Sequence, residues 1–405
     1  MNVYFVVPFF MEATLRFVEG AASLPGVRLA IISQDPIERL PAALRAKVSG
    51  HWRVEDGLDP VRIAEAVRQL ARHVGAPDRI IGSLEQLQVR LAEVRSHFGL
   101  PGLSVEAAHN FRDKATMKTV LERNGLPCAR HRLASAGEEA VAFVRAVGLP
   151  VVVKPPAGAG AVNTFRLDDP ADLERYLERH PPSVQRPVLF EEFLRGEEYS
   201  FDAVLIDGRM VWHSISSYRP APLTVLENPW IQWCVLLPRE IDRPEFEDIR
   251  RSGFKALRAL GLETGMSHME WFRRTDGGIA ISEAGARPPG AQFTTLISYA
   301  HDFDFYSAWP RLVIFGAFDA PERRYATGAA YVRGLGTGRV KAIHGLEQAQ
   351  REVGSLVVAS QLPKPGQAQP SGYEGAGYVI LRHPETAVVE QGLKRIIEVL
   401  RIELA

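Results

Sequence analysis

Two glutamates, Glu270 and Glu283, stand in apolar segments that are joined by Asp276-Gly277. Asp-Gly between alternating apolar residues is a strong signal for a tight hairpin, because both residues tolerate the left-handed backbone of the turn. If these two residues alone form the loop, Glu270 lies directly opposite Glu283. The sequence thus predicts two carboxylates side by side on one face of an antiparallel pair of strands.

Such a carboxylate pair is unfavourable without a cation. Directly opposed side chains have Cβ atoms roughly 4.5–5.5 Å apart, and two like charges there destabilise the sheet by up to about 1 kcal/mol. Mg²⁺ removes the repulsion, because it binds through one or two carboxylates together with substrate phosphates. The competing interpretation is a pair of hydrated glutamates on an open sheet face.

Arg287 follows Glu283 by four residues, in the glycine- and proline-rich segment 284–290. Its guanidinium offers a planar fork for phosphate or carboxylate that a lysine cannot match. In isolation such an arginine is a surface ion-pair partner. Beside a metal pair it is a candidate for stabilising the negative charge that develops in a transition state.

Lys154 ends a β-branched run and is followed by a loop that contains Gly158 and Gly160. A buried lysine needs a partner, and a glycine-rich loop can turn several backbone N–H groups toward an anion. A phosphate satisfies both requirements. The alternative is a flexible connector after a strand whose lysine reaches out to water.

Three weaker signals accompany these residues. Lys114 and Lys118 lie one turn apart on a predicted helix, which usually indicates a solvated basic face. The segment 188–198 reads as a buried strand and a turn, with backbone groups and a carboxylate that suit ribose hydroxyls. His268 shares a strand face with Glu270, where a supporting or core role fits better than catalysis.

The composition excludes several classes of protein. Lys plus Arg and Asp plus Glu number 48 each in 405 residues, so no net charge favours nucleic acid or anionic lipid. Two cysteines make no disulfide framework, which favours the cytoplasm. The apolar run 3–10 lacks the flanks of a signal peptide and the length of a membrane span, so it predicts a buried strand.

The elements that position these residues are predicted from periodicity. Short apolar runs alternate with helical patterns in residues 1–103, which predicts a parallel α/β domain. A helix over 112–124 opens a small α+β lobe, 104–195, and strand patterns dominate the large lobe, 196–405. More strands are expected after Ala291, then an exposed loop over 364–373 and a closing helix near 387–400.

In this order and spacing, the motifs resemble the ATP-grasp family, specifically its carboxylate–amine ligases. The resemblance implies an ATP-grasp fold, of mixed α/β and α+β class in several domains, with a parallel α/β domain before it. It implies that the lobe 104–195 closes over ATP. It also assigns roles to individual residues: Lys114, Lys154, Gly158, Gly160 and Ala161 to ATP phosphates, Glu191, Glu192, Phe193 and Leu194 to adenine, Glu198 to ribose, Glu270 and Glu283 to magnesium, and Arg287 with Lys154 to catalysis.

One position departs from the family pattern. The commonest form has Asn two residues after the second glutamate, where this chain has Gly285. A nearby carboxylate such as Glu227 would then replace that magnesium ligand. Glu227, His268 and Gly290 are further expected to contact substrate. The glycine form resembles L-amino-acid ligases that make dipeptides.

The resemblance implies that a substrate carboxylate is phosphorylated by ATP, with magnesium or manganese, and that an amine then displaces phosphate to give an amide. Small carboxylates and amines, amino acids in both cases, are the expected partners, and the family's habit points to a homodimer. Two alternatives stay open. One is an enzyme that activates bicarbonate or formate, and the other is a nucleotide-binding protein without turnover.

Overall fold

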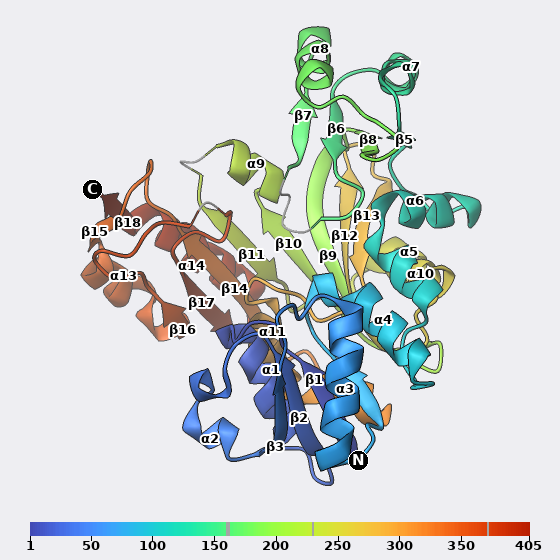
Figure 1. The fold of residues 1–405 in the computed structure, drawn as a ribbon. Coiled ribbons are helices and arrows are strands. Elements are labelled where there is room, and N and C mark those ends of the chain that lie inside the picture. The colour runs from blue at the N-terminus through green and yellow to red at the C-terminus, as the bar shows by residue number, and fades with distance from the viewer. Residues whose placement is uncertain (159–162, 229–230, 371) are drawn as a thin grey trace.

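The computed structural model describes residues 1–158, 163–228, 231–370 and 372–405. Figure 1 shows an N-terminal domain in blue at the bottom, a small lobe with α7 and α8 at the top, and a large antiparallel sheet between them. This mixed architecture confirms the predicted fold class. Within these ranges, no helix combines the length and the apolar character needed to cross a membrane.

The N-terminal domain contains a parallel sheet with the strand order β3-β2-β1-β4 among the described residues. β1 and β2 are apolar and buried, as expected for central parallel strands. β3 was not predicted, because its residues are only partly buried and form no apolar run. The strands are β1 (Asn2–Val6), β2 (Arg28–Ser33), β3 (Val48–Arg53) and β4 (Arg79–Ile81), and the helices are α1 (Glu12–Ala22), α2 (Ala42–Arg45), α3 (Pro60–Val74) and α4 (Gln88–His97).

The helix predicted over 112–124 is α6 (Lys114–Arg123), and a second helix that was not predicted, α5 (Val105–Arg112), precedes it. Asp113 separates them in an extended conformation, and its side chain accepts a hydrogen bond from Thr116 N at 2.7 Å. The aspartate thus caps α6. As a result Lys114 is the first residue of this helix, whereas the prediction made it the third.

The small lobe is a sheet with the order β5-β8-β6-β7 and two helices. Asp169 caps the second helix by accepting a hydrogen bond from Asp172 N at 2.8 Å, and Pro170 stands at its first position. These elements match the predicted ones closely. They are β5 (His131–Ala134), α7 (Gly137–Val147), β6 (Val151–Lys154), β7 (Phe165–Leu167), α8 (Pro170–Arg179) and β8 (Val188–Glu192).

The large lobe contains a sheet with the order β13-β12-β9-β10-β11-β14-β17-β16 among the described residues. Its strands are β9 (Gly196–Ile206), β10 (Arg209–Arg219), β11 (Trp233–Leu237), β12 (Gly265–Arg274), β13 (Ile279–Gly285), β14 (Ala326–Val332), β16 (Val357–Gln361) and β17 (Gly377–His383). Further elements are α9 (Pro222–Glu227), α10 (Glu247–Ala259), β15 (Val340–His344), α13 (Leu346–Val353), α14 (Thr386–Val399) and β18 (Arg401–Leu404). α14 is the predicted closing helix.

The strands expected after Ala291 are present as β14 to β18, but the structure of the segment directly after Ala291 was not predicted. That segment forms two helices, α11 (Phe293–His301) and α12 (Phe305–Phe315). Both are largely buried, and Phe17 of α1 packs against Trp309 of α12 with ring centroids 5.2 Å apart. A helix that is apolar on most of its surface has no amphipathic stripe, so its periodicity does not distinguish it from buried strands.

The hairpin between β12 and β13 has a longer loop than predicted but shows the predicted pairing of Glu270 with Glu283. The loop is longer than Asp276-Gly277, because Arg273 pairs with Ile279 and Arg274 N bonds to Gly278 O. A β-bulge between β12 residues 270 and 271 then shifts the register by one residue. Beyond the bulge, Glu270 pairs with Glu283 as predicted.

The N-terminal domain and the large lobe share one hydrophobic core. Its members include Phe5 and Leu29 from the parallel sheet, Trp309 from α12 and Trp233 from β11. The small lobe has a separate core around Phe143 and Phe190. The first two parts therefore form a common base on which the small lobe stands.

Candidate active site

A cavity of about 640 Å³ lies between the small lobe and the large sheet, with one wall from the N-terminal domain. This volume is within the range of roughly 300–1,000 Å³ typical of small-molecule sites. The structure brings together here every site residue predicted from the sequence that it describes: Lys114, Lys154, Gly158, Glu191, Glu192, Phe193, Leu194, Glu198, Glu227, His268, Glu270, Glu283, Arg287 and Gly290. Gly160 and Ala161 lie outside the described residues.

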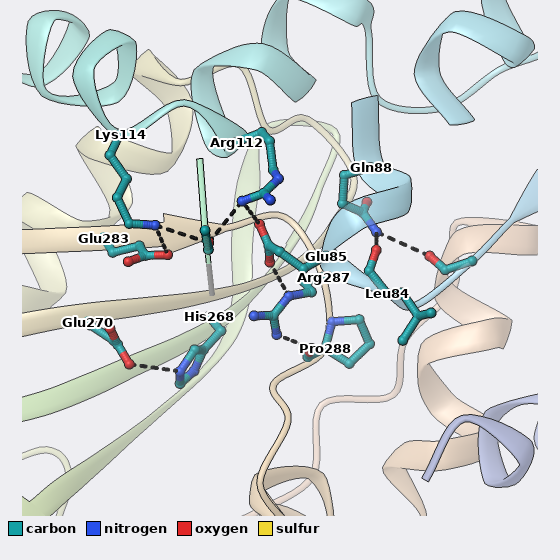
Figure 2. A network of polar contacts seen from close by, with 12 residues as sticks. Leu84, Glu85, Gln88, Arg112, Lys114, His268, Glu270, Glu283, Arg287 and Pro288 are labelled. Atoms are coloured by element: carbon teal, nitrogen blue, oxygen red, sulfur yellow. Dashed lines mark hydrogen bonds and ion pairs between the residues drawn. The ribbon is translucent and has the colours of Figure 1, made fainter. Parts of the chain in front are cut away.

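The acidic pair faces this cavity from the large sheet. Glu283 accepts a hydrogen bond from Lys114 Nζ at 2.7 Å, and the same ammonium donates to Gly158 O at 3.2 Å (Figure 2). Burial opposes ionisation of Glu283, but the charges of Lys114 and Lys154 outweigh it and lower its pKa to about 2. Glu283 is therefore a carboxylate at any physiological pH.

The neighbouring carboxylates lack such compensation. Burial and then the charge of Glu283 raise the pKa of Glu270. Burial raises the pKa of Glu198 well above its usual value, and Glu270 raises it further. Strand pairing places Ser200 opposite Glu270, so Glu198 lies two residues along the same face. Three carboxylates thus stand on one sheet face with Lys114 as a close cation.

Lys154 faces the cavity from β6 and is bound by Glu191 of the adjacent strand β8. The distance from Lys154 Nζ to Glu191 Oε1 is 3.0 Å, and Lys118 Nζ lies 3.4 Å from Glu191 Oε2. All three side chains are buried. Two lysines therefore share one carboxylate, and of the two only Lys154 belongs to the cavity wall as described.

The segment predicted to contact adenine runs along the cavity wall at the junction of the lobes. The side chain of Glu192 accepts hydrogen bonds from Arg130 N at 3.0 Å and Arg130 Nε at 2.7 Å. Its contribution to ligand binding would thus come from its backbone. The guanidinium of Arg166 lies over the ring of Phe193, 4.4 Å from the centroid, which covers this part of the cavity.

Arg287 is held by a residue that the sequence reasoning missed. Glu85 of the N-terminal domain accepts a hydrogen bond from Arg287 Nε and lies 3.8 Å from Arg112 Nη1 (Figure 2). Arg287 Nη1 also donates to Pro288 O at 2.8 Å. Glu85 follows β4 directly, and the carboxyl end of a parallel strand is where ligand sites concentrate. The position of Glu85 after a predicted parallel strand is the sequence signal from which it could have been identified.

Glu85 also explains the glycine at position 285. A Cβ atom built on Gly285 would lie 3.2 Å from Glu85 Oε2, so a side chain there would press against this carboxylate. Glu85 is therefore a carboxylate in direct contact range of position 285. Glu227 lines the cavity from α9, where burial raises its pKa and the nearest opposing charge is Arg166.

His268 is oriented by a buried aspartate. Its Nδ1 lies 2.7 Å from Asp202 Oδ1, and its Nε2 lies 3.3 Å from the hydroxyl of Tyr218. Burial lowers its pKa, but Asp202 more than offsets this effect, so the net shift is upward. Asp202 and Tyr218 were not predicted from the sequence, because an alternating strand pattern does not show which residues on two other strands lie beside His268.

The chain was also compared with known proteins by sequence and by structure. No family model matches the sequence. The chain is 25% identical over 264 residues to an L-arginine-specific L-amino acid ligase from Bacillus subtilis, with 62% of each protein covered. It is 24% identical over 289 residues to an alanine–anticapsin ligase from Bacillus subtilis strain 168, covering 66% of this chain and 60% of that protein. It thus spans about three fifths of the length of these curated relatives.

Solved structures give the fold. An L-amino acid ligase from Bacillus licheniformis matches with a TM-score of 0.80 and 20% identity, covering 100% of this chain and 98% of that chain. N5-carboxyaminoimidazole ribonucleotide synthetase from Thermotoga maritima matches with a TM-score of 0.70 and 18% identity, covering 100% and 99%. These matches show that the chain has the ATP-grasp fold. In sequence, the chain is similar to the two amino-acid ligases named above.

Proposed function

We propose that this protein is an ATP-dependent ligase that joins the carboxylate of one amino acid to the amine of another, with release of ADP and phosphate. The observation that carries the proposal is the meeting of Glu270 and Glu283 with Lys114, Lys154 and Arg287 in one cavity. The names of the sequence relatives support amino acids as substrates.

The donor set suits magnesium, or manganese in its place. Glu270 and Glu283 offer opposed hard oxygen ligands, and the raised pKa of Glu270 reflects a repulsion that a cation removes. The described residues contain no group of three or more His, Cys, Asp or Glu side chains arranged to hold a metal. The remaining ligands would thus be phosphate oxygens and water, with Glu85 beside Gly285 as a further oxygen. When bound, the metal supplies charge neutralisation for phosphoryl transfer.

ATP binding follows from the residues around the acidic pair. Lys114 and Lys154 are proposed to bind the phosphates, and the segment 191–194 the adenine. Glu198, buried between them and the acidic pair, is proposed to bind the ribose. The loop after Lys154 belongs to the small lobe, whose closure would exclude water from a hydrolysable acyl phosphate.

Arg287 is the proposed catalytic arginine. Its guanidinium lies beside the acidic pair, and Glu85 and the carbonyl of Pro288 fix its orientation. A positive group held in place before the reaction stabilises charge on the acyl phosphate and on the tetrahedral intermediate without reorganisation. Lys154 neutralises the transferred phosphoryl group. No protein nucleophile takes part, because the substrate carboxylate itself attacks the phosphate.

The substrate amino acids are proposed to occupy the part of the cavity near Gly290. Arg287 is a cation there and the pKa of His268 is raised, so both suit a carboxylate, while the carboxyl groups of Glu85 and Glu227 suit an ammonium group. The rings of Tyr218 and Trp233, with centroids 5.7 Å apart, line the same region. These roles remain proposals.

The decisive experiment measures phosphate release from Mg-ATP with all amino acids singly and pairwise, followed by mass spectrometry of each active mixture. Release that requires two amino acids, with a dipeptide mass, is the expected result. The surface variant Glu347→Gln, whose side chain is 94% exposed, provides a matched control that retains activity.

Other outcomes select the alternatives. Phosphate release that depends on bicarbonate or formate alone would replace the amino-acid ligase by an enzyme that activates a small acid. Tight ATP binding without release in any mixture would favour a nucleotide-binding protein without turnover.

We also propose that the protein works in the cytoplasm as a homodimer. The two cysteines, Cys128 and Cys234, are unpaired, in keeping with a reducing compartment. Sedimentation of the purified chain tests the dimer, and a monomer at every concentration would contradict it.

A further inference from the structure

A second cavity of about 370 Å³ lies where the N-terminal domain meets the large lobe. One side is formed by β4, α4 and the linker residues 101–103, and the other by α12 and the start of β12. Its lining shares no residue with that of the first cavity. It is therefore a separate site, and the proposed ligase reaction gives it no role.

Arg95 of α4 is the unusual residue of this cavity, because it is a buried charge without a counter-ion. Its exposed fraction is 9%, and burial lowers its pKa to about 10. Nη1 donates to Ile80 O at 3.2 Å and Nη2 to Leu103 O at 3.4 Å, and both acceptors are neutral. Among the described residues, Arg95 Nε has no hydrogen-bond partner and no carboxylate forms an ion pair with this guanidinium.

A buried guanidinium without a counter-ion is costly, since the two carbonyl oxygens replace only part of its lost hydration. The linker packs closely against it, because a Cβ atom on Gly102 would lie only 2.6 Å from Arg95 Nε. The bare backbone of this glycine therefore packs directly against the guanidinium. The geometry keeps a donor-rich cation at the wall of a cavity large enough for a small molecule.

The rest of the lining restricts the ligand. Arg79 adds a second positive charge, whereas Asp207 is an exposed carboxylate on the β9–β10 turn. Much of the opposite wall is apolar: Met266, Trp309, Leu312, Val313 and Phe315. A guanidinium binds a carboxylate through two parallel hydrogen bonds. We propose that the second cavity binds a small carboxylic acid with an apolar body, whose carboxylate pairs with Arg95.

A ligand in the second cavity would touch segments that also reach the first cavity. Its walls include Gly82 and Ala286, which lie close in sequence to Glu85 and Arg287 respectively. Gln88, another wall residue, donates hydrogen bonds to Gly82 O at 3.3 Å and to Leu84 O at 2.9 Å (Figure 2). A bound ligand would therefore contact both segments that carry the Glu85–Arg287 pair and would link the two domains.

The test is calorimetric titration of the full chain with 4-methylpentanoate, a carboxylate with an apolar body and no amine. We expect the wild type to bind it, Arg95→Gln to bind at least about tenfold more weakly, and the neutral 4-methylpentanamide not to bind. The matched control is Arg287→Gln, which removes the arginine of the first cavity and should leave binding unchanged.

The proposal is overturned if the wild type does not bind the acid, if Arg95→Gln binds it equally well, or if Arg287→Gln loses binding instead. If inorganic phosphate binds as tightly as the acid, the cavity does not require a ligand with an apolar body, and that part of the proposal is wrong. Val313→Trp, from a half-buried position on α12, fills the cavity without touching the charge and should also prevent binding. If Arg95→Gln does not fold, unchanged binding by Val313→Trp decides against the site.

Discussion

The two sides of the proposed active site carry opposite charge excesses. On the large sheet, Glu198, Glu270 and Glu283 face one close lysine, Lys114. On the small-lobe side, Lys118 and Lys154 share the single carboxylate of Glu191. A metal-bound phosphate has complementary charges at its two ends, so it would neutralise both sides at once. The difference shows that, in the free protein, each side carries an excess of one charge that lowers the stability of the fold.

The largest effect is expected from the acidic side. Glu283→Gln removes a proposed magnesium ligand and the partner of Lys114, so it should lower the rate of ADP formation by more than about a hundredfold. Circular dichroism should show an unchanged fold. If Glu283→Gln turns over at the wild-type rate, the acidic side does not bind the metal and the comparison between the two sides fails.

The basic side can be divided between its two lysines. Lys154→Met should weaken ATP binding by about tenfold or more, because Lys154 lines the cavity. Lys118→Met should change ATP binding by less than about threefold but lower the free energy of unfolding by about 1–3 kcal/mol, since it removes a fully buried partner of Glu191. Nucleotide titration and denaturant unfolding measure the two effects. Equal losses of ATP affinity would show that both lysines bind phosphate.

Sequence reasoning reached most of this site because its residues lie in local patterns. Lys154 ends an apolar strand, and Glu270 and Glu283 belong to one hairpin. The predicted pairing of the two glutamates was correct although the predicted loop was too short. The bulge near Glu270 compensates for that error, and no local pattern shows it.

What the sequence could not give are contacts between distant segments. Glu85 and Arg287 are separated by 202 residues, and Asp202 and His268 by 66. Such pairs depend on how the domains pack. The same limit applies to α11 and α12, whose apolar residues identify burial but not the type of element. Topology therefore had to come from the structure.

A smaller effect separates Glu85, which lies beside Gly285, from Glu227 on α9. Glu85→Gln removes the partner of Arg287 and Arg112, and we expect roughly a tenfold loss of kcat with little change in the KM for ATP. Glu227→Gln, the matched variant on α9, should change kcat by less than about threefold. Steady-state kinetics distinguishes the two. A larger loss with Glu227→Gln would restore Glu227 as the replacement for the missing asparagine.

The smallest effect concerns stability within the acidic pair itself. The folded pKa of Glu270 is raised, so its ionisation at neutral pH costs stability in the free protein. The folded pKa of Glu283 is lowered to about 2, so its charge contributes stability that is present above its unfolded pKa and is lost as the pH falls toward 2. At pH 7 without ATP or metal, Glu270→Gln should therefore raise the Tm, and Glu283→Gln should lower it, each by roughly 1–4 °C.

Both differences from the wild type should shrink below pH 4, where Glu270 is protonated in the folded protein and the glutamate at position 283 becomes protonated in the unfolded chain while it is still charged in the folded one. Calorimetric scans from pH 7 to pH 3 measure this directly. Shifts of the same sign for the two variants would mean that the carboxylates are equivalent. In that case Lys114 would not favour Glu283 over Glu270. The excess of negative charge on the large sheet would then be shared equally by the two paired glutamates, instead of lying on Glu198 and Glu270.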